Sequence, residues 1–337
     1  MRAVGFHHFG GPDVLEVLDL PEPHAGRGQV RIKVAAVAVN PSDTVSRSGQ
    51  AKALMQKADP DLEYPPGPYV VGWDAAGVID EIGEDAPDDL AVGDHVMAVT
   101  LPVGAGGAYA EYLALSAESV VHAPAGWDDV AACTLPLNGL TARLALDLLA
   151  LPPGSTVAVT GAAGAFGGYA VQLAKADGLR VVADASDADR DLVTRLGADV
   201  VVRRGDDVAE RIRQAVPDGV DGLADGAVLH DKVVAAVRNG GRIATLRSYT
   251  GREEREITWH PVHVMQYLRA RAQLDRLRRQ AEAGVLTPRI ADVLPIEKAA
   301  EAHRRLEAGG TRGRLVLTLS PVEWKNPPRQ SSQGSTM

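Results

Sequence analysis

The chain has 337 residues, of which 45% are hydrophobic and 23% are charged, so it contains enough apolar side chains for about two folded domains. Its net charge of −9, with scattered basic residues, argues against nucleic-acid binding, and its apolar stretches are far shorter than the roughly 20 residues of a membrane span. The N-terminus lacks the apolar run of a signal peptide, and the single cysteine, Cys133, excludes an internal disulfide framework. We therefore expect a cytoplasmic protein with neither a nucleic-acid nor a membrane partner.

The first 125 residues or so are β-rich. Short strands are predicted at residues 29–37, 70–79 and 93–99, where apolar side chains alternate or run together between glycines. A short helix is predicted around residues 53–55, and a proline-rich loop follows at residues 64–68. Many short strands at nearly regular spacing favour a barrel-like β domain.

The pattern changes at about residue 125. Strands are predicted at residues 156–160, 180–184, 199–202, 219–223 and 242–246, and helical stretches separate them, the first at about 166–177. Alternation in units of about 25 to 30 residues predicts parallel βαβ units. The fold class is therefore α/β, with a doubly wound parallel sheet.

The last part of the chain combines a helix, a strand and a polar tail. An arginine-rich amphipathic helix follows residue 263, and we interpret its arginines as a solvated face. A strand is predicted at residues 315–319. Residues 321–337 are rich in Pro, Ser and Gln, which predicts a disordered tail.

A glycine-rich turn lies between the predicted strand at 156–160 and the helix that follows it. Its glycines are spaced three residues apart, which lets the backbone approach a pyrophosphate while the helix N-terminus supplies N–H donors. The alternative is a tight turn with a purely structural role. The strand–turn–helix context favours dinucleotide binding by the seven residues of the turn: Gly161, Ala162, Ala163, Gly164, Ala165, Phe166 and Gly167.

Several sequence blocks occur in order along about residues 1–318. They are N-P-S-D at 40–43 with Arg47 and Gly49, and the blocks at 72–78, 92–96, 107–112, 135–142, 161–175, 294–303 and 312–317. This series resembles the quinone oxidoreductase branch of the medium-chain dehydrogenases/reductases, the zeta-crystallin-like proteins. The resemblance implies a GroES-like β-barrel catalytic domain at residues 1–125 and 265–320, a Rossmann cofactor domain at 126–264, and a homodimer.

The resemblance also implies a function. Members of the branch use NAD(P)H to reduce quinones or activated C=C bonds, and the residues at the positions of Asn40 and Thr141 lie beside the nicotinamide. We therefore expect a small-molecule reductase in which these two residues are catalytic. The residues alone leave a turn for Asn40 and helix packing for Thr141 as alternatives. Asp43 and Arg47 are either a structural pair or part of the catalytic machinery.

No metal site is expected. Zinc-dependent relatives place a cysteine in the first block, a His-Glu pair after the glycine of the second, and a four-cysteine loop elsewhere. This chain has Asn40 to Asp43 and Trp73-Asp74 at the first two places. A catalytic zinc needs three protein ligands, and without one an acceptor that needs little electrophilic help is favoured. An enoyl reductase of a biosynthetic pathway and a non-catalytic nucleotide-binding protein remain as alternatives.

The sequence gives conflicting signals about the choice between NADH and NADPH. Asp184 ends the second strand of the α/β part, where an acidic residue favours the ribose hydroxyls of NADH. The resembling branch prefers NADPH, and nearby arginines favour a 2′-phosphate. We expect NADPH, with NADH as the alternative. The candidate cofactor ligands beyond the turn are Asp184, Ser186, Arg190, Arg204 and, in the closing block, Arg314.

The substrate pocket is the least defined part of the site. Its walls are expected from separated segments, with the candidate residues Tyr64, Tyr69, Asn138, Tyr249 and His260. The long connection at residues 50–68 is either a lid over this pocket or a surface excursion.

Overall fold

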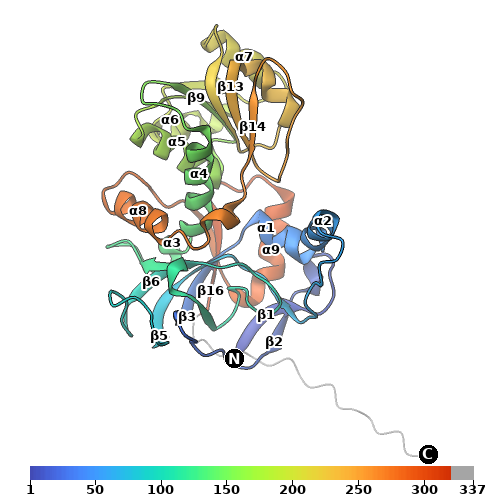
Figure 1. Ribbon diagram of the computed structural model, residues 1–337, viewed down its shortest axis with the longest axis vertical. Coiled ribbons are helices and arrows are strands. Elements are labelled where there is room, and N and C mark those ends of the chain that lie inside the picture. Colours follow the sequence, from blue (N-terminus) through green and yellow to red (C-terminus); the bar gives the residue numbers. More distant parts are fainter. Residues whose placement is uncertain (320–337) are drawn as a thin grey trace, which may run out of the picture.

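The computed structural model describes residues 1–319. The tail predicted to be disordered, residues 321–337, lies outside the described residues. The described chain forms two lobes, and α4 (Pro136–Leu149) lies between a parallel sheet and a β-rich lobe (Figure 1). Within these residues no helix is long and apolar enough to cross a membrane.

The β-rich lobe contains two sheets. A three-stranded sheet has the order β2-β1-β4, and a larger sheet has the order β15-β16-β3-β5-β6-β8, with β7 paired to β3. The N-terminal strands are β1 (Arg2–Phe6), β2 (Glu16–Asp19), β3 (Gln29–Ala38), β4 (Tyr69–Val70), β5 (Asp74–Ile82), β6 (His95–Val99), β7 (Tyr112–Ser116) and β8 (Val120–His122). Two helices, α1 (Pro41–Arg47) and α2 (Gln50–Ala58), connect β3 to β4.

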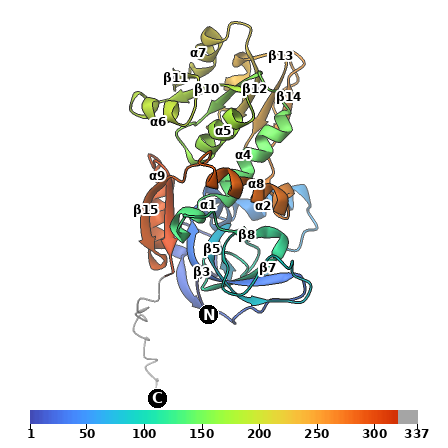
Figure 2. The same cartoon turned by 90° about the vertical axis from the view of Figure 1, so that its left-hand side faces the viewer.

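The end of the described chain returns to the β-rich lobe. β15 (Ile290–Pro295) pairs in parallel with β16 (Arg314–Thr318), and β16 runs antiparallel to β3. The helix α9 (Ala299–Ala308) connects the two strands on the outside of the lobe (Figure 2). One lobe is therefore built from both ends of the described chain.

The second lobe is a six-stranded parallel sheet with the order β11-β10-β9-β12-β13-β14. This order is typical of doubly wound nucleotide-binding sheets. The strands are β9 (Thr156–Thr160), β10 (Arg180–Ala185), β11 (Val200–Arg203), β12 (Val220–Asp225), β13 (Val237–Thr245) and β14 (Thr258–Pro261). Around them lie α4, α5 (Ala165–Ala176), α6 (Arg190–Arg195) and α7 (Val208–Ala215). The helix α3 (Asp129–Ala132) packs instead against β3 and β5, and α8 (Arg271–Glu282) packs against β8 and α4.

Apolar cores lie on both faces of this sheet. Val157 and Val159 on β9 belong to a core that also contains α4, α5 and residues of β3 and β6, while Ala158 belongs to a separate core with α7. Successive strand residues point to opposite faces, so β9 contributes to both cores. Because the first core includes residues of the β-rich lobe, the two lobes are joined by continuous apolar packing.

The predicted α/β fold with a doubly wound sheet is confirmed, and so is the short helix around residues 53–55, which is part of α2. The strand predicted at 70–79 is wrong as a single element, because β4 and β5 are separate. Gly72, between them, has φ of +106° and lies against Tyr109 and Ala108, so the backbone turns there. The exact domain boundaries stay a prediction, since α8 packs against both α4 and β8.

Gly167 gives a first test of the packing between α5 and the glycine-rich turn. A Cβ at Gly167 would lie 2.2 Å from the Gly161 carbonyl oxygen, whereas one at Gly168 would lie 3.3 Å from the end of the flexible Arg289 side chain. We expect Gly167→Ala to lower the free energy of unfolding by about 1–3 kcal/mol through overpacking. Gly168→Ala, the matched control, should change it by less than about 1 kcal/mol. Urea denaturation measures both, and equal losses would contradict this account of the turn.

Candidate active site

Asn40 lies where β3 ends and α1 begins. Its backbone is extended, with φ of −115° and ψ of 151°, and Pro41 starts the helix. The Asn40 backbone N–H donates to Asp43 Oδ2 at 2.8 Å, so the first turn of α1 holds the residue that precedes it. The side chain of Asn40 is thereby fixed at the junction of the two lobes.

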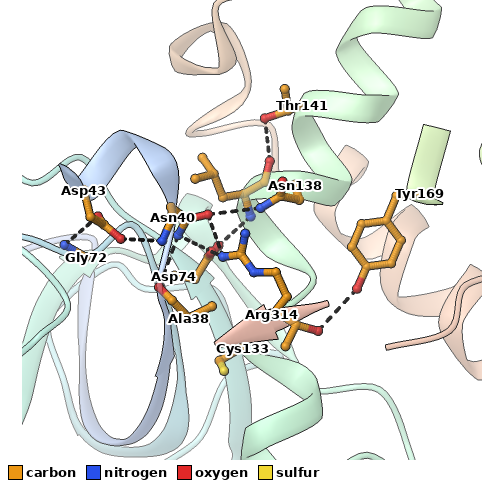
Figure 3. Close-up of polar contacts among 12 residues, drawn as sticks. Ala38, Asn40, Asp43, Gly72, Asp74, Cys133, Asn138, Thr141, Tyr169 and Arg314 are labelled. Atoms are coloured by element: carbon orange, nitrogen blue, oxygen red, sulfur yellow. Dashed lines mark hydrogen bonds and ion pairs between the residues drawn. The ribbon is translucent and has the colours of Figure 1, made fainter. Parts of the chain in front are cut away.

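The side-chain amide of Asn40 is fully buried, and each of its hydrogen-bonding positions is occupied. Its Nδ2 donates to the Ala38 carbonyl oxygen at 3.2 Å and to Asp74 Oδ2 at 2.9 Å. Its Oδ1 accepts from Asn138 Nδ2 at 3.0 Å and from Arg314 Nη2 at 2.6 Å (Figure 3). In this structure the Asn40 side chain therefore has no free donor or acceptor for the expected catalytic contact. Asn40 instead orients Asn138 and Arg314.

Asp74 is the buried anion of this cluster. Its Oδ1 accepts from the backbone N–H of Leu137 at 2.5 Å, in the first turn of α4, and its Oδ2 lies 3.4 Å from Arg314 Nη2. Burial raises the pKa of Asp74 to about 6, while Arg314 and the hydrogen bonds from Asn40 and Leu137 oppose that rise. Asp74 is not among the site residues predicted from the sequence. Its place in the block where zinc relatives carry a glutamate was the available signal.

Two half-buried residues beside the buried cluster come from α4. Asn138 and Thr141 are half-buried, one helical turn apart, and so share a face of the helix. The Thr141 hydroxyl donates to the Leu137 carbonyl oxygen at 2.6 Å, which leaves it free only as an acceptor (Figure 3). Of the two residues, Asn138 therefore offers the amide hydrogen that no described contact uses.

A second buried chain of polar residues supports α1 from the side of α9. The Tyr109 hydroxyl donates to Asp43 Oδ2 at 3.3 Å and lies 3.3 Å from His303 Nε2, while His303 Nδ1 is 3.1 Å from the Arg47 guanidinium. Arg47 can only donate, so Nδ1 accepts and Nε2 carries the proton. Burial raises the pKa of Asp43 to about 7 and lowers that of His303 to about 3. Asp43 and Arg47 are thus linked through two other residues rather than paired directly.

The glycine-rich turn follows β9, as expected. Gly161 has φ of +65°, Gly164 is the N-cap of α5, and a side chain at Gly167 would collide with the Gly161 carbonyl group. A cavity of about 260 Å³ lies beside the turn. Residues of both lobes line it: Gly161, Ala163, Gly164, Asp184, Ala185, Ser186, Asp189, Arg204, Gly226, Ala227, Gly310, Thr311 and Arg312. The turn, the open cavity and the helix N-terminus together fit a dinucleotide.

Asp184 is engaged with the turn. Its Oδ1 accepts from the backbone N–H of Ala162 at 3.2 Å, and the Gly161 N–H also hydrogen-bonds the carboxylate. Burial raises the pKa of Asp184, and the charge of Arg204 opposes that rise. Asp184 lines the cavity, but part of its hydrogen-bonding capacity stabilises the turn itself.

The candidate arginines have different positions. Arg204 lines the cavity, and within the described contacts its guanidinium has no hydrogen-bonding partner. Arg190 donates to the Val201 carbonyl oxygen at 2.9 Å and does not line the cavity. Arg314 lies in the Asn40 cluster and also lines a small cavity with Ala165, Gly168 and Tyr169 of α5. Arg314 therefore lies between the Asn40 cluster and the helix that begins at the turn.

The four predicted aromatic and histidine pocket residues belong to two separate groups. Tyr64 and Tyr69 pack against Phe9, with ring centroids 6.1 and 4.8 Å from it, on the side of β1 and α2. Tyr249 packs against Trp259 of β14, next to His260. The two groups share no ring contact or hydrogen bond within residues 1–319. Of the predicted pocket residues, the structure brings only Asn138 into the Asn40 cluster.

The chain matches two family models. The model described as alcohol dehydrogenase GroES-like domain matches residues 26–125, and the one described as zinc-binding dehydrogenase matches residues 196–317. The chain is 30% identical to an NADPH-dependent alkenal/one oxidoreductase of Arabidopsis thaliana, over 95% of this chain and 80% of that protein. It is also 30% identical to a quinone oxidoreductase of Pongo abelii, over 95% of this chain and 98% of that protein.

The chain belongs to the quinone oxidoreductase branch of the medium-chain dehydrogenase/reductase superfamily. It is therefore an NAD(P)H-dependent oxidoreductase. Among solved structures, an NAD-dependent alcohol dehydrogenase is 31% identical, with a TM-score of 0.81 over 95% of this chain and all of that one. The CurK enoyl reductase is 25% identical, with a TM-score of 0.82 over 94% of this chain and 98% of that one.

The residues present do not fit the zinc ion that one family description names. Within residues 1–319, no group of three or more His, Cys, Asp or Glu side chains could hold a metal ion. Cys133 is fully buried, burial raises the pKa of its thiol well above the usual range, and its Sγ lies against the Val130 carbonyl oxygen at 3.4 Å. No catalytic step is therefore assigned to a metal.

A larger cavity, of about 490 Å³, lies elsewhere on the Rossmann lobe. It is lined mainly by charged residues: Arg213, Asp231, Val234, Ala235, Arg252, Glu254 and Arg255. It shares no residue with the turn or with the Asn40 cluster. The size of a cavity alone therefore does not identify the dinucleotide site, because this larger cavity has no glycine-rich turn.

His303 makes the stability of the protein depend on pH in a predictable direction. The unfolded histidine has a pKa of about 6.5 and takes up a proton below it, whereas the buried one stays neutral down to about pH 3. The neutral folded form is favoured above pH 6.5, and that advantage is lost as pH falls. The stability gap between wild type and His303→Gln should therefore shrink by about 2 kcal/mol between pH 7.5 and pH 5.

Urea denaturation at the two pH values measures this gap. His7→Gln is the matched control for the loss of a histidine, because His7 is exposed. A gap for His303→Gln that is the same at pH 7.5 and pH 5 would contradict the buried, neutral state of His303.

Proposed function

We propose that the chain is a zinc-independent, NADPH-dependent reductase that transfers hydride to a quinone or to the C=C bond of an α,β-unsaturated carbonyl compound. The observation that carries this proposal is the position of Arg314, which donates to Asn40 and lines a small cavity, of about 10 Å³, with the first turns of α5. It connects the Asn40 cluster to the helix that begins at the dinucleotide turn. The activities named for the oxidoreductases of A. thaliana and P. abelii support the two acceptor classes.

The nicotinamide supplies the hydride when the cofactor is bound. The turn and the N-terminus of α5 would hold the pyrophosphate, while Asp74, Asn40 and Arg314 keep the start of α4 in place. Asn138 and Thr141 then present one donor and one acceptor from the same face of α4. Hydride addition to the β-carbon of an enone places negative charge on the carbonyl oxygen, and the unused amide hydrogen of Asn138 stabilises that charge. A proton from solvent completes the reduction.

Charges around the cavity favour NADPH over NADH. Asp184 is engaged with the amides of the turn, and Asp189 is paired with Arg312 at 2.8 Å. Within the described contacts this leaves Arg204 as a cation without a hydrogen-bonding partner beside the cavity. A 2′-phosphate carries about two negative charges at neutral pH and binds well to arginine. The named cofactor of the A. thaliana oxidoreductase agrees with this preference, whereas that of the NAD-dependent alcohol dehydrogenase does not.

An enoyl reductase of a biosynthetic pathway is the second candidate, supported by the likeness to the CurK enoyl reductase. It differs only in the acceptor, because an enoyl thioester is also an activated C=C bond. A homodimer, as in the resembling branch, is part of the proposal. β14 is an edge strand of the six-stranded sheet, and an edge strand can pair with a second copy of the chain.

The proposed reaction is tested by following NADPH oxidation with a small quinone, a small enone and an enoyl thioester in parallel. We expect turnover with at least one of the first two. Asn138→Ala should lower kcat by at least about tenfold, because a donor to the developing oxyanion is lost, without changing the Kd of NADPH. Asn239→Ala, at an exposed position on β13, is the matched control. Turnover of the thioester alone favours the second candidate, and binding of NADPH without any turnover contradicts both.

Cofactor preference has its own test. Arg204→Ala should reduce the ratio of NADPH to NADH affinity by about tenfold, because a charge-assisted bond to the 2′-phosphate is lost. Arg203→Ala is the control, since Arg203 is exposed and faces Asp187 at 3.9 Å rather than the cavity. Titration of each cofactor by fluorescence measures the ratio. An unchanged ratio in Arg204→Ala would contradict the role of Arg204.

A further inference from the structure

The cofactor cavity is shared between the lobes. Most of its lining comes from the Rossmann lobe, but Gly310, Thr311 and Arg312 reach it from the connection between α9 and β16. These three residues come from a segment that begins and ends in the β-rich lobe. A residue of that segment can therefore recognise the cofactor only when both lobes are in this arrangement.

Glycines make the path of this segment possible. Gly309, Gly310 and Gly313 have φ of +74°, +75° and +112°, a region that side chains disfavour. A Cβ at Gly313 would also lie 2.7 Å from the Arg289 carbonyl oxygen. The backbone can thus make a sharp turn on each side of Thr311 and Arg312. Because these glycines allow the turns, the loop can place Arg312 at the cavity.

Arg312 is held at the cavity by a buried acid. Its Nε lies 2.8 Å from Asp189 Oδ1, and the Ser186 hydroxyl donates to Asp189 Oδ2 at 2.6 Å. The Asp189 side chain is only 7% exposed, and these two bonds lower its pKa, as does the charge of Arg204. Asp189 is therefore a charged acceptor with both oxygens in use. It holds the Nε of Arg312 beside the cavity that this arginine lines.

We propose that Arg312 binds the 2′-phosphate of the cofactor from across the lobe boundary, with Asp189 as its anchor and Arg204 as the second cation. The proposal rests on the proposed preference for NADPH. Arg312 Nη1 donates to the Gly310 carbonyl oxygen at 2.6 Å, and no described contact uses Nη2. A guanidinium has five N–H donors, so Arg312 can keep Asp189 and still bind an oxyanion. The phosphate would then lie between two arginines rather than against two carboxylates.

The test uses ligands that contain only the adenosine end of the cofactor. The ratio of the Kd of 5′-AMP to that of 2′,5′-ADP, measured by calorimetry on the full chain, reports recognition of the 2′-phosphate without any acceptor. Arg312→Gln should lower this ratio by about tenfold, since a charged hydrogen bond to the phosphate is lost. Arg312→Lys should keep most of it. Arg305→Gln is the matched control, because Arg305 is on α9 and pairs with Asp292 at 2.7 Å away from the cavity.

Asp189→Asn separates phosphate binding from a merely structural ion pair. It breaks the same pair as Arg312→Gln but keeps the cation, so its ratio should stay well above that of Arg312→Gln. Equal loss of the ratio in both variants, or an equal loss of affinity for both ligands in Arg312→Gln, would overturn the proposal. A wild-type protein that does not prefer 2′,5′-ADP contradicts the proposed NADPH preference itself, which is a distinct outcome from a preference that survives in Arg312→Gln.

Discussion

The buried carboxylate of Asp74 is the constraint on which the arrangement of the two lobes depends. A carboxylate taken out of water loses several kcal/mol of hydration unless donors replace the water. Here the donors come from three distant parts of the chain: Asn40 after β3, Leu137 at the start of α4, and Arg314 at the start of β16. Asp74 keeps all three donors only while these segments stay together, so the polar cluster adds to the apolar core in fixing their positions.

The same cluster occupies every hydrogen-bonding position of the Asn40 side chain. An amide with four occupied positions cannot exchange one for a substrate without leaving a buried partner unsatisfied. Its amide oxygen holds Asn138 and Arg314 in position. The hydrogen-bonding groups that remain free are on the half-buried side chains of α4, Asn138 and Thr141. The chain of Tyr109 and His303 behind Asp43 extends this support to α9, because Asp43 holds the Asn40 backbone.

One short segment connects cofactor recognition with the catalytic cluster. Arg312 lines the dinucleotide cavity and Arg314, two residues later, donates to Asn40. Gly313, between them, has φ of +112° and lets the backbone lie against Arg289. A displacement of this segment would therefore affect both ends of the site at once.

Much of the Rossmann lobe could be predicted because its signals are local. The turn from Gly161 to Gly167 and the strand–helix alternation depend on spacing and residue type within a few positions. β14 was not predicted, because it lacks such a local signal. Thr258–Pro261 is short and contains a histidine and a proline, and only its pairing with β13 makes it a strand. Tyr64 and Tyr69 were predicted for the pocket, but their rings are packed with Phe9, a residue more than fifty positions away.

The sequence by itself determined the fold class, the family and the dinucleotide turn, because each follows from patterns read along the chain. Only the tertiary structure decided that Asn40 has no free hydrogen-bonding position, that Asp184 is engaged with its own turn, and that Arg312 meets Asp189. Those facts depend on which groups share a buried space, and residues up to 274 positions apart share it here. Hydrogen-bonding capacity and electrostatics are set by such neighbours in space, which spacing along the chain does not specify.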